Sequence, residues 1–443
     1  MQSRLIVRNF GPIEYVDLDL RNVNVFIGPQ ASGKSALAKL YTIFKAPRKF
    51  LKDVKDDTIK QTVSIANPFF KEVLEEYNIA SFIKSDTGIE FESELHSLIY
   101  DGKEITYVPK LLKRIQKLEK LKNDFPIKKG SIKKEIIDLS KDFFLFQFEI
   151  DDILKDKEDD FMSIEEYTFD KLDIDTFQSI LEVIKNIEMH LSTNAALYIP
   201  SERNFINIVK NASLNLLLNK VPIPKHILSF GAELEKANIK KIDLGFLNEN
   251  ITYKNIKGED RIFTNNKHSI KLTEAASGIQ SVLPILIPIL SRNSLSYQRS
   301  FVIEEPELNL FPIAQYKLIK LLESNRDEPD WEDYGAIHTY TTHSPYILSS
   351  FNNLLYANKV IKSLKEKYKT ASVISREYEK IEKQVGEIIT RDIDPKTFTA
   401  YQISNGGAES IFDREKGLII DNYIDEASDT MADDFDALMN LMK

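Results

Sequence analysis

The sequence predicts an α/β fold with a mixed central sheet flanked by helices and interrupted by a large helical insertion. Three observations indicate it. The apolar run 23–27 is followed by a glycine-containing loop and an apolar-periodic stretch, the order strand, loop, helix. A second apolar run, 301–303, ends in acidic residues. Between the two, residues 51–189 change to Lys, Glu, Asp, Ile and Leu at helical spacing, so we expect one unit from 1–50 and 190–443 and another from 51–189.

Composition excludes several classes of protein. The 443-residue chain has no cysteine, which excludes a disulfide framework and any thiolate metal site. Residues 1–4 lead directly into an apolar strand, without the apolar core of a signal peptide. The longest apolar stretch, 282–290, carries two prolines and is shorter than the ~20 residues of a membrane span. We therefore expect a cytoplasmic protein with no membrane partner.

The first elements form a hairpin and a phosphate-binding loop. Residues 5–20 alternate apolar and polar residues around a turn at 11–12, which predicts a hairpin. Residues 28–35 read Gly-Pro-Gln-Ala-Ser-Gly-Lys-Ser and fit the pattern G-x-x-x-x-G-K-[ST] in full. Such a loop points successive N–H groups and a helix N-terminus at one anion. We expect ATP to be bound by Gly28, Pro29, Gln30, Ala31, Ser32, Gly33, Lys34, Ser35 and Ala36, with Lys34 on the β- and γ-phosphates and the Ser35 hydroxyl on Mg²⁺.

The insertion 51–189 is expected to be a helical bundle or a short antiparallel coiled coil. Leu111, Ile115 and Leu118 follow one helical face. Its leading part is basic and its trailing part, within 151–166, is acidic. Net charge −9 argues against a wholesale nucleic-acid coat, but two interpretations of the local charge stay open: solvated faces that partly neutralise each other, or a basic docking face for nucleic acid or an acidic protein.

After the insertion the α/β pattern returns. Residues 196–203 predict a short strand that ends in a polar elbow, and 247–272 predict β-structure with Asn and Gly turns. Further on, 362–389 is a charged helical stretch, and 399–412 predicts a hairpin around the Asn-Gly pair at 405–406.

The strand 301–304 resembles a Walker B arrangement, because it is apolar and ends in two adjacent acids. A strand end places one carboxylate on the Mg²⁺ shell and lets the next face the attacking water. Side chains alternate along a strand, and Pro306 stops the strand there. We assign Glu304 to the metal and Glu305 to water activation.

The segment 274–281 contains a second anion-binding helix start. Ser277 and Gly278 open an apolar helix, and Gln280 follows in its first turn. A single chain that binds one nucleotide needs only one such site. A second site is needed in a homodimer or higher homo-oligomer, where two subunits share each nucleotide. Each subunit's turn, with Ser277, Gly278 and Gln280, can then close over the γ-phosphate held by the other subunit's loop.

His343 lies between a strand, 336–341, and a proline-initiated helix. A histidine placed there can hydrogen-bond the γ-phosphate and sense its loss. A lone histidine is usually structural, so this catalytic role depends on its position after the three preceding motifs.

The order of these motifs resembles the ABC-type ATPase heads over residues 1–50 and 190–355. More narrowly, 198–203, 276–281, 304–307 and 342–346 resemble a bacterial subgroup containing the overcoming-lysogenization-defect (OLD) ATPases and anti-phage ATPase subunits such as AriA of PARIS and PtuA of Septu. The resemblance implies a slow, dimeric ATPase clamp that senses phage infection and controls a separately encoded effector, a nuclease. It also places Arg203 near the nucleotide, although a structural ion pair is an equal alternative. Residues 309–312 depart from the subgroup's usual His-Leu-His-Pro run, which questions any role beyond packing across the dimer.

Two other functions remain possible at this stage. A DNA-repair ATPase of the SMC/RecF kind would grip duplex DNA with the basic part of the insertion, for which Lys113, Arg114 and Lys117 are the test positions. A transporter's ATPase subunit is the other, but the long insertion and the Ser-Gly-Ile-Gln sequence argue against it.

Overall fold

We describe the protein from a computed structural model. Its described residues are 2–47, 62–123, 125, 127–142, 150, 153–154, 172–193, 196–209, 219, 221–237, 239–264, 268–291, 300–326, 329–330, 333–334, 336–368, 376–420, 431–435 and 438–439.

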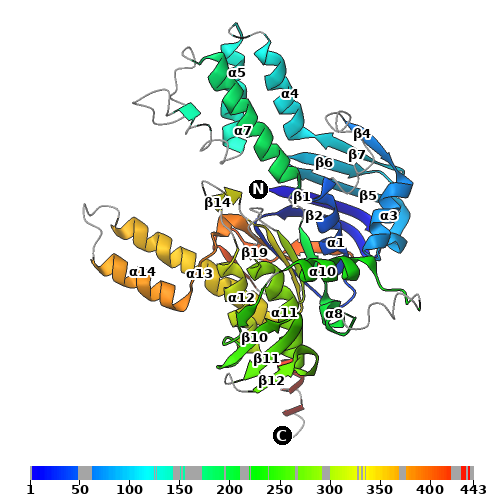
Figure 1. Ribbon diagram of the computed structural model, residues 1–443, viewed down its shortest axis with the longest axis vertical. Coiled ribbons are helices and arrows are strands. Elements are labelled where there is room, and N and C mark those ends of the chain that lie inside the picture. The colour runs from blue at the N-terminus through cyan, green and yellow to red at the C-terminus, as the bar shows by residue number, and fades with distance from the viewer. Residues whose placement is uncertain are drawn as a thin grey trace.

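A six-stranded mixed sheet forms the centre of the molecule (Figure 1). Five strands are parallel, and the edge strand β18 (Gly407–Ser410) is antiparallel. The inner strands β3 (Val23–Ile27), β16 (His338–Thr342) and β13 (Phe301–Glu304) are buried along their whole length, because helices cover both faces of the sheet. In spatial order the strands are β18 (Gly407–Ser410), β17 (Phe398–Ser404), β3 (Val23–Ile27), β16 (His338–Thr342), β13 (Phe301–Glu304) and β8 (Leu197–Ile199).

A second six-stranded sheet, wholly antiparallel, covers helix α1 (Lys34–Phe44). The expected N-terminal hairpin is confirmed and forms one edge of this sheet. Leu37, Leu40 and Phe44 of α1 belong to its buried core. In spatial order its strands are β2 (Ile13–Leu20), β1 (Ser3–Phe10), β5 (Ile83–Ser93), β6 (His96–Tyr100), β7 (Glu104–Pro109) and β4 (Val63–Ala66).

The expectation that residues 51–189 are helical throughout is wrong for 63–66 and 83–109, because these ranges contain strands β4 to β7. The only helices before Lys110 in the described part of this segment are α3 (Asn67–Glu76) and the short turn η2 (Ala80–Phe82). In β5, Thr87, Ile89 and Phe91 are buried while their neighbours face solvent. The charged residues of that open face give the strands the composition of surface helices, which hides their alternation.

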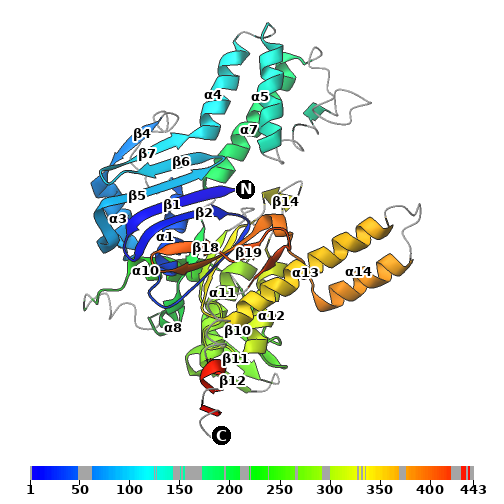
Figure 2. The same cartoon turned by 180° about the vertical axis from the view of Figure 1, so that it is seen from behind.

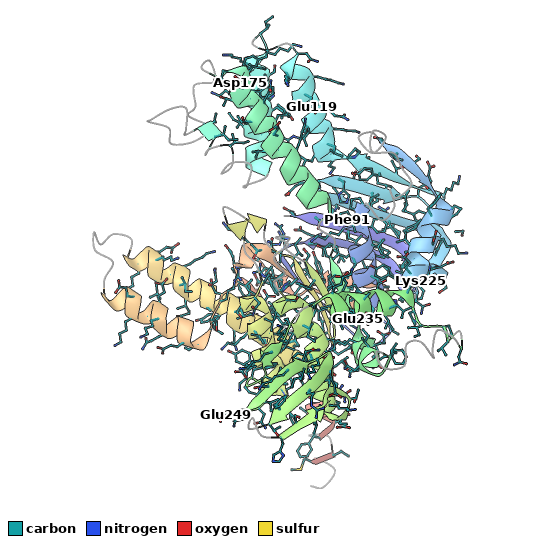
Figure 3. All side chains as sticks on the ribbon, in the orientation of Figure 1. Phe91, Glu119, Asp175, Lys225, Glu235 and Glu249 are labelled. Carbon is teal, nitrogen blue, oxygen red and sulfur yellow. The ribbon has the colours of Figure 1, made fainter. Side chains whose placement is uncertain are left out.

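The helical part of the insertion is a bundle that projects from one end of the molecule, as the reverse view shows (Figure 2). Helices α4 (Lys110–Lys122), α5 (Lys129–Asp142) and α7 (Ile174–Thr193) share one apolar core, to which Leu111, Ile115 and Leu118 contribute as expected. Glu119 and Asp175 lie on this bundle, far from Glu249 at the opposite end (Figure 3). The acidic residues expected in its trailing part fall outside the described residues.

A four-stranded antiparallel sheet confirms the β-structure expected at 247–272 and packs with three helices. One of these, α11 (Ser277–Leu290), is the apolar helix that the Ser-Gly turn opens. The other elements are β9 (Lys241–Asp243), β10 (Ile251–Ile256), β11 (Glu259–Thr264), β12 (His268–Lys271), α8 (Asn204–Val209) and α10 (Lys225–Lys236).

The C-terminal part contributes an arm and a strand pair. Helices α13 (Pro345–Tyr368) and α14 (Arg376–Ile388) extend sideways as a helical hairpin (Figure 1). The hairpin expected at 399–412 is confirmed as β17 and β18, and β17 pairs with β3 beside the phosphate-binding loop. No helix among the described residues is long and apolar enough to cross a membrane.

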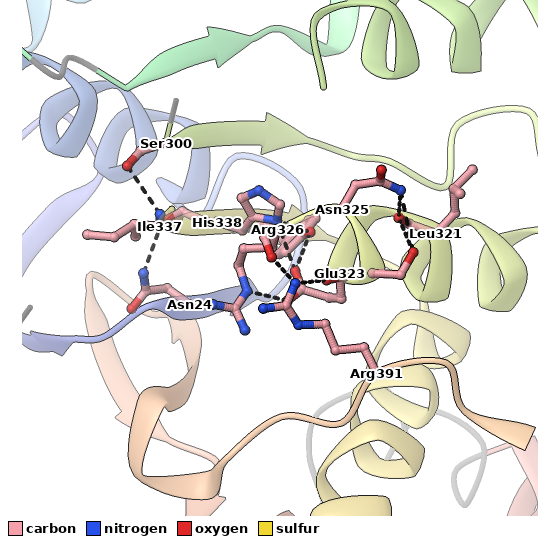
Figure 4. A network of polar contacts seen from close by, with 12 residues as sticks. Asn24, Ser300, Leu321, Glu323, Asn325, Arg326, Ile337, His338 and Arg391 are labelled. Carbon is pink, nitrogen blue, oxygen red and sulfur yellow. Dashed lines mark hydrogen bonds and ion pairs between the residues drawn. The ribbon is translucent and has the colours of Figure 1, made fainter. Parts of the chain in front are cut away.

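A buried charge network joins α12 (Pro312–Ser324) to the start of β16 (Figure 4). Glu323 Oε1 lies 3.0 Å from His338 Nδ1, and Glu323 Oε2 accepts from Arg326 Nε at 2.7 Å. The Tyr340 hydroxyl also donates to Glu323 at 2.7 Å. Burial opposes ionisation of Glu323, but Arg326 and His338 outweigh it and hold the pKa of Glu323 at about 2. This network lies at the end of the parallel sheet opposite the candidate site.

Candidate functional site

The phosphate-binding loop lies between β3 and α1, as the sequence predicts. Gly33 has φ 105° and is the left-handed residue that starts α1. A Cβ at Gly33 would lie 2.5 Å from Ile13 Cδ1, and one at Gly28 would lie 2.0 Å from the Ile403 carbonyl oxygen. Glycine is therefore required at both positions, because the N-terminal hairpin and strand β17 press against the loop.

Lys34 is buried beneath this loop with its ammonium group held by the loop itself. Its Nζ donates to the carbonyl oxygens of Gly28 at 2.8 Å and Pro29 at 2.7 Å. Burial lowers the pKa of Lys34 to about 8, and the nearby carboxylates of Glu305, Glu307 and Glu304 oppose this shift. Lys34 is thus a cation placed within the field of three acids. Ser35 follows in the first turn of α1 and is exposed.

The two acids at the end of β13 occupy different environments, because Glu304 is the last residue of the strand and Glu305 follows it with a left-handed backbone. Glu304 is 2% exposed, and its Oε2 accepts from the Ser201 N–H at 3.3 Å. Glu305 is partly exposed and has φ 44°, a left-handed conformation that costs on the order of 1 kcal/mol or more for a residue with a side chain. Burial and the neighbouring Glu304 raise the pKa of Glu305.

His343 lies at the end of β16, beside Glu305. Its Nε2 atom is 3.7 Å from Glu305 Oε1. Burial and the nearby Lys34 lower the pKa of His343, so its imidazole is neutral at pH 7. The contact is therefore not an ion pair at that pH, and the neutral imidazole has a single N–H donor, for which the Gly28 backbone is also a partner.

Glu307 is a site residue to which the sequence analysis assigned no role. Its Oε1 accepts from the His343 N–H and from the Thr342 hydroxyl, each at 2.8 Å. This buried carboxylate fixes the loop that carries His343 to the turn that carries Glu305. Burial raises the pKa of Glu307.

The Ser-Gly turn lies against the segment that follows the acids, not against the phosphate-binding loop. Ser277 is exposed at the start of α11, and a Cβ on Gly278 would lie 2.7 Å from the Asn309 carbonyl oxygen. Gln280 Nε2 donates to the Ala275 carbonyl at 2.8 Å. Within the described chain, no hydrogen bond joins Ser277, Gly278 or Gln280 to residues 28–36. One chain therefore brings together the loop, Glu304, Glu305 and His343, but not the Ser-Gly turn.

Arg203 lies beside the two acids of the candidate site, but it does not form the structural ion pair that was the other expectation. Its side chain is fully buried, and it donates to backbone carbonyl oxygens rather than to a carboxylate. The expected structural ion pair is absent from the contacts of the described residues. Burial lowers the pKa of Arg203 to about 10, so it remains a cation at neutral pH.

The residues present fit a magnesium ion. The second oxygen of Glu304, Oε1, is buried and accepts no hydrogen bond from any described residue. Mg²⁺ is commonly held by one or two protein oxygens and by the phosphates of its nucleotide, so Ser35 and Glu304 form an adequate donor set. No cluster of three or more His, Asp or Glu suited to a metal occurs in the described ranges.

Sequence reasoning missed the residues that position this site. Ser201 and Glu307 act through buried contacts between segments far apart in the chain. For Ser201 the available signal was the polar elbow after the strand at 196–203, whose sequence does not reveal what it contacts.

The elements that surround the site have the order that the sequence predicts for an α/β P-loop ATPase head. The loop strand β3 and the acidic strand β13 are separated by β16, which carries His343 at its end. The antiparallel sheet covers α1, and α11 begins at the Ser-Gly turn.

The chain matches one described protein family in sequence and is similar to several solved structures at low identity. The family model described as "AAA ATPase domain" matches residues 1–348. No curated protein matches the sequence. Among solved structures, the Smc head domain bound to the C-terminal domain of ScpA, from Pyrococcus furiosus, shares 10% identity over 94% of this chain and 97% of that one, with a TM-score of 0.34. The SMC head domain from Thermotoga maritima shares 10% identity over 93% and 98%, with a TM-score of 0.35. The recombination mediator RecF shares 11% over 93% and 98%, with a TM-score of 0.30. Because the family model covers most of its length, the chain belongs to the AAA ATPase-domain family and is an ATPase.

Proposed function

We propose that this chain dimerises head to head around two molecules of ATP·Mg²⁺ and works as a slow conformational clamp. The observation that carries the proposal is the division of the site. Lys34, Glu305 and His343 converge in one chain, whereas no hydrogen bond in the described chain joins Ser277 or Gly278 to that chain's own loop. A second copy can supply the missing turn to each γ-phosphate.

Within each subunit the side chains have separate tasks. Lys34 exchanges its loop carbonyl partners for the β- and γ-phosphate oxygens of ATP. Glu305, as a carboxylate, accepts a proton from the water that attacks the γ-phosphorus, and ADP leaves with the broken bridging oxygen. His343 donates a hydrogen bond to a γ-phosphate oxygen and loses it when phosphate departs. Magnesium bound by Ser35 and Glu304 would neutralise charge on the phosphates.

The surface beside the Ser-Gly turn suits a second copy of the chain. Phe311 is 83% exposed and Ile313 is 62% exposed, directly after the segment on which Gly278 packs. Tyr346, three residues after His343, is 49% exposed. Large apolar side chains grouped around a catalytic face favour a protein interface there.

The cellular role in this proposal depends on the motif resemblance described above. The clamp would sense phage infection and, according to its nucleotide state, hold or release a separately encoded effector, a nuclease. The competing role is that the insertion grips DNA. It is less favoured than the sequence suggests, because several basic side chains of the insertion form ion pairs within the chain. Arg114 and Lys117 both pair with the buried Glu135, and Lys110 pairs with Glu92 at 2.5 Å. Salt-dependent DNA binding that is lost on charge reversal at Lys113, Arg114 and Lys117 would restore that role.

A complementation assay tests the dimer. Lys34→Ala removes one subunit's loop cation, and Ser277→Asp places a negative charge at the exposed start of the other subunit's turn without a side chain at Gly278. Each variant alone should be inactive, but a mixed dimer has one intact composite site. Mixing equal amounts should restore about one quarter of the wild-type rate, because half of the dimers are mixed and each has one of two sites. A mixture that stays inactive although mixed dimers form contradicts the proposal.

A further inference from the structure

The strongest feature outside the assigned site is the buried guanidinium of Arg203, at the elbow after β8. Its nitrogen atoms donate to four carbonyl oxygens: Ser281 at 2.8 Å, Pro200 at 3.1 Å, Glu304 at 2.7 Å and Glu305 at 2.7 Å. These belong to the helix that opens with the Ser-Gly turn, to the elbow itself and to the end of β13. A planar fork of five N–H donors can join three segments at once, which an ammonium group cannot do with the same rigidity.

The bond to Glu305 holds a backbone conformation that is unfavourable by itself. Glu305 has φ 44°, and its carbonyl oxygen accepts from both Arg203 Nη2 and the Leu308 N–H. Its own N–H donates to the Thr341 carbonyl at 2.9 Å. The direction of the Glu305 side chain is set by this backbone, so the Arg203 contact acts on the general base through its main chain.

Ser281 also connects helix α11 to the turn at 305–309, by contacts separate from those of Arg203. Its buried hydroxyl donates to the Ser277 carbonyl at 2.9 Å and accepts from Asn204 Nδ2 at 2.8 Å and from Asn309 Nδ2 at 2.9 Å. Gly278 lies directly on the Asn309 carbonyl. The Ser-Gly turn, the elbow at 203–204 and the turn at 305–309 are therefore cross-linked by polar contacts inside one subunit.

We propose that Arg203 and Ser281 are positioning residues that make the Ser277–Gly278 turn and the backbone of Glu305 move as one unit. When the turn meets a γ-phosphate held by the partner subunit, its displacement is passed to the Glu305 of its own subunit. Nucleotide binding at one composite site thereby changes the position of Glu305 at the other site. Hydrolysis is in this way coordinated between the two sites. The transfer between subunits rests on the proposed dimer, whereas the alignment of Glu305 by Arg203 does not.

Steady-state hydrolysis and equilibrium ATP binding of Arg203→Lys test the inference. This variant keeps the charge but cannot bridge the three segments. We expect kcat to fall at least about tenfold per folded molecule, with the Kd for ATP changed less than about twofold. Glu323→Gln is the matched control, a buried polar change remote from the site, which should lower stability while leaving kcat per folded molecule unchanged. A folded Arg203→Lys protein with wild-type kcat, or with kcat and ATP binding lost in parallel, overturns the inference.

Ser281→Ala keeps the proposal testable if Arg203→Lys does not fold, because it removes one hydroxyl only. It should lower kcat several-fold at unchanged ATP affinity, and in the double variant its effect should be less than additive with that of Arg203→Lys. Unchanged kcat in Ser281→Ala, or full additivity, argues against a shared bridge. A wild-type protein that remains a single chain with saturating ATP refutes the dimer, while the kcat effect of Arg203→Lys within that chain still decides the alignment of Glu305.

Discussion

His343 Nε2 lies 3.7 Å from Glu305 Oε1, and the two side chains come from the ends of adjacent parallel strands. Glu307 holds His343 in this position, because its carboxylate accepts a hydrogen bond from the backbone N–H of His343. The two residues to which we assign the base and the γ-phosphate sensor are therefore held as a pair, near a lysine whose pKa is lowered by burial to about 8.

Substitution of Lys34 and of Glu305 should separate binding from turnover. Lys34→Ala removes the only charge expected to reach the β- and γ-phosphates, and should abolish ATP binding. Glu305→Gln should bind ATP normally and lower kcat by about 10² or more, since it removes the base. Binding is measured by calorimetry and turnover by phosphate release, with the exposed Lys365→Ala as control. Normal hydrolysis by Glu305→Gln or Glu305→Ala would show that the base is wrongly assigned.

As the pH is lowered, the rate of hydrolysis should begin to fall at a higher pH than it would with a solvent-exposed glutamate as the base. Burial and Glu304 raise the pKa of Glu305, so protonation removes its basic form at milder acidity. Burial and the nearby Lys34 lower the pKa of His343, so its protonation sets in at greater acidity than that of a free histidine. The pH profile of kcat/KM tests this, and Glu305→Gln should lack the acidic limb. An identical limb in that variant would assign the titration to another group.

Glu323→Gln should lower the free energy of unfolding by about 3 kcal/mol at pH 7, because it leaves Arg326 and His338 without their shared carboxylate. The pKa of Glu323 is depressed from 4.5 to about 2, so its stabilising contribution is complete above pH 4.5 and is lost as pH falls towards 2. The difference between variant and wild type should therefore shrink over that interval in urea titrations. Glu387→Gln, an exposed change on the arm, should have no such effect. A difference independent of pH would contradict the assignment.

Gly278→Ala should impair turnover but leave ATP binding to the free subunit intact. The added Cβ would lie 2.7 Å from the Asn309 carbonyl oxygen, so the Ser-Gly turn must shift. Gly130→Ala is a suitable control, because a Cβ there meets no neighbouring atom within 4 Å. Full activity in Gly278→Ala would mean that the close contact with Asn309 has no part in the reaction.

The sequence was sufficient for the site's parts that are local along the chain. The loop 28–35, the acids after β13 and the Ser-Gly helix each consist of consecutive residues whose local order has a direct physical reason. The structure has the expected strand or helix at each of them. The C-terminal hairpin was likewise predictable, because Asn405 and Gly406 favour its turn.

Other features depend on contacts between distant segments and could not be derived from local pattern. Strands β5 to β7 carry charged residues on an open face, so their composition resembles that of a helix. Arg203 is a cation whose partners are carbonyl oxygens, which every residue possesses, and no sequence pattern marks such a site. Glu307 was visible as an acid after Pro306, but its hold on His343 required the pairing of β13 with β16.

The central claim is that two copies of this chain enclose ATP. Its most direct test is the mass of the Glu305→Gln protein in solution, measured by analytical ultracentrifugation with and without ATP and Mg²⁺. The account predicts a single chain without nucleotide, a dimer with ATP, and no ATP-dependent dimer for Lys34→Ala. A single-chain mass for Glu305→Gln at saturating ATP would contradict it.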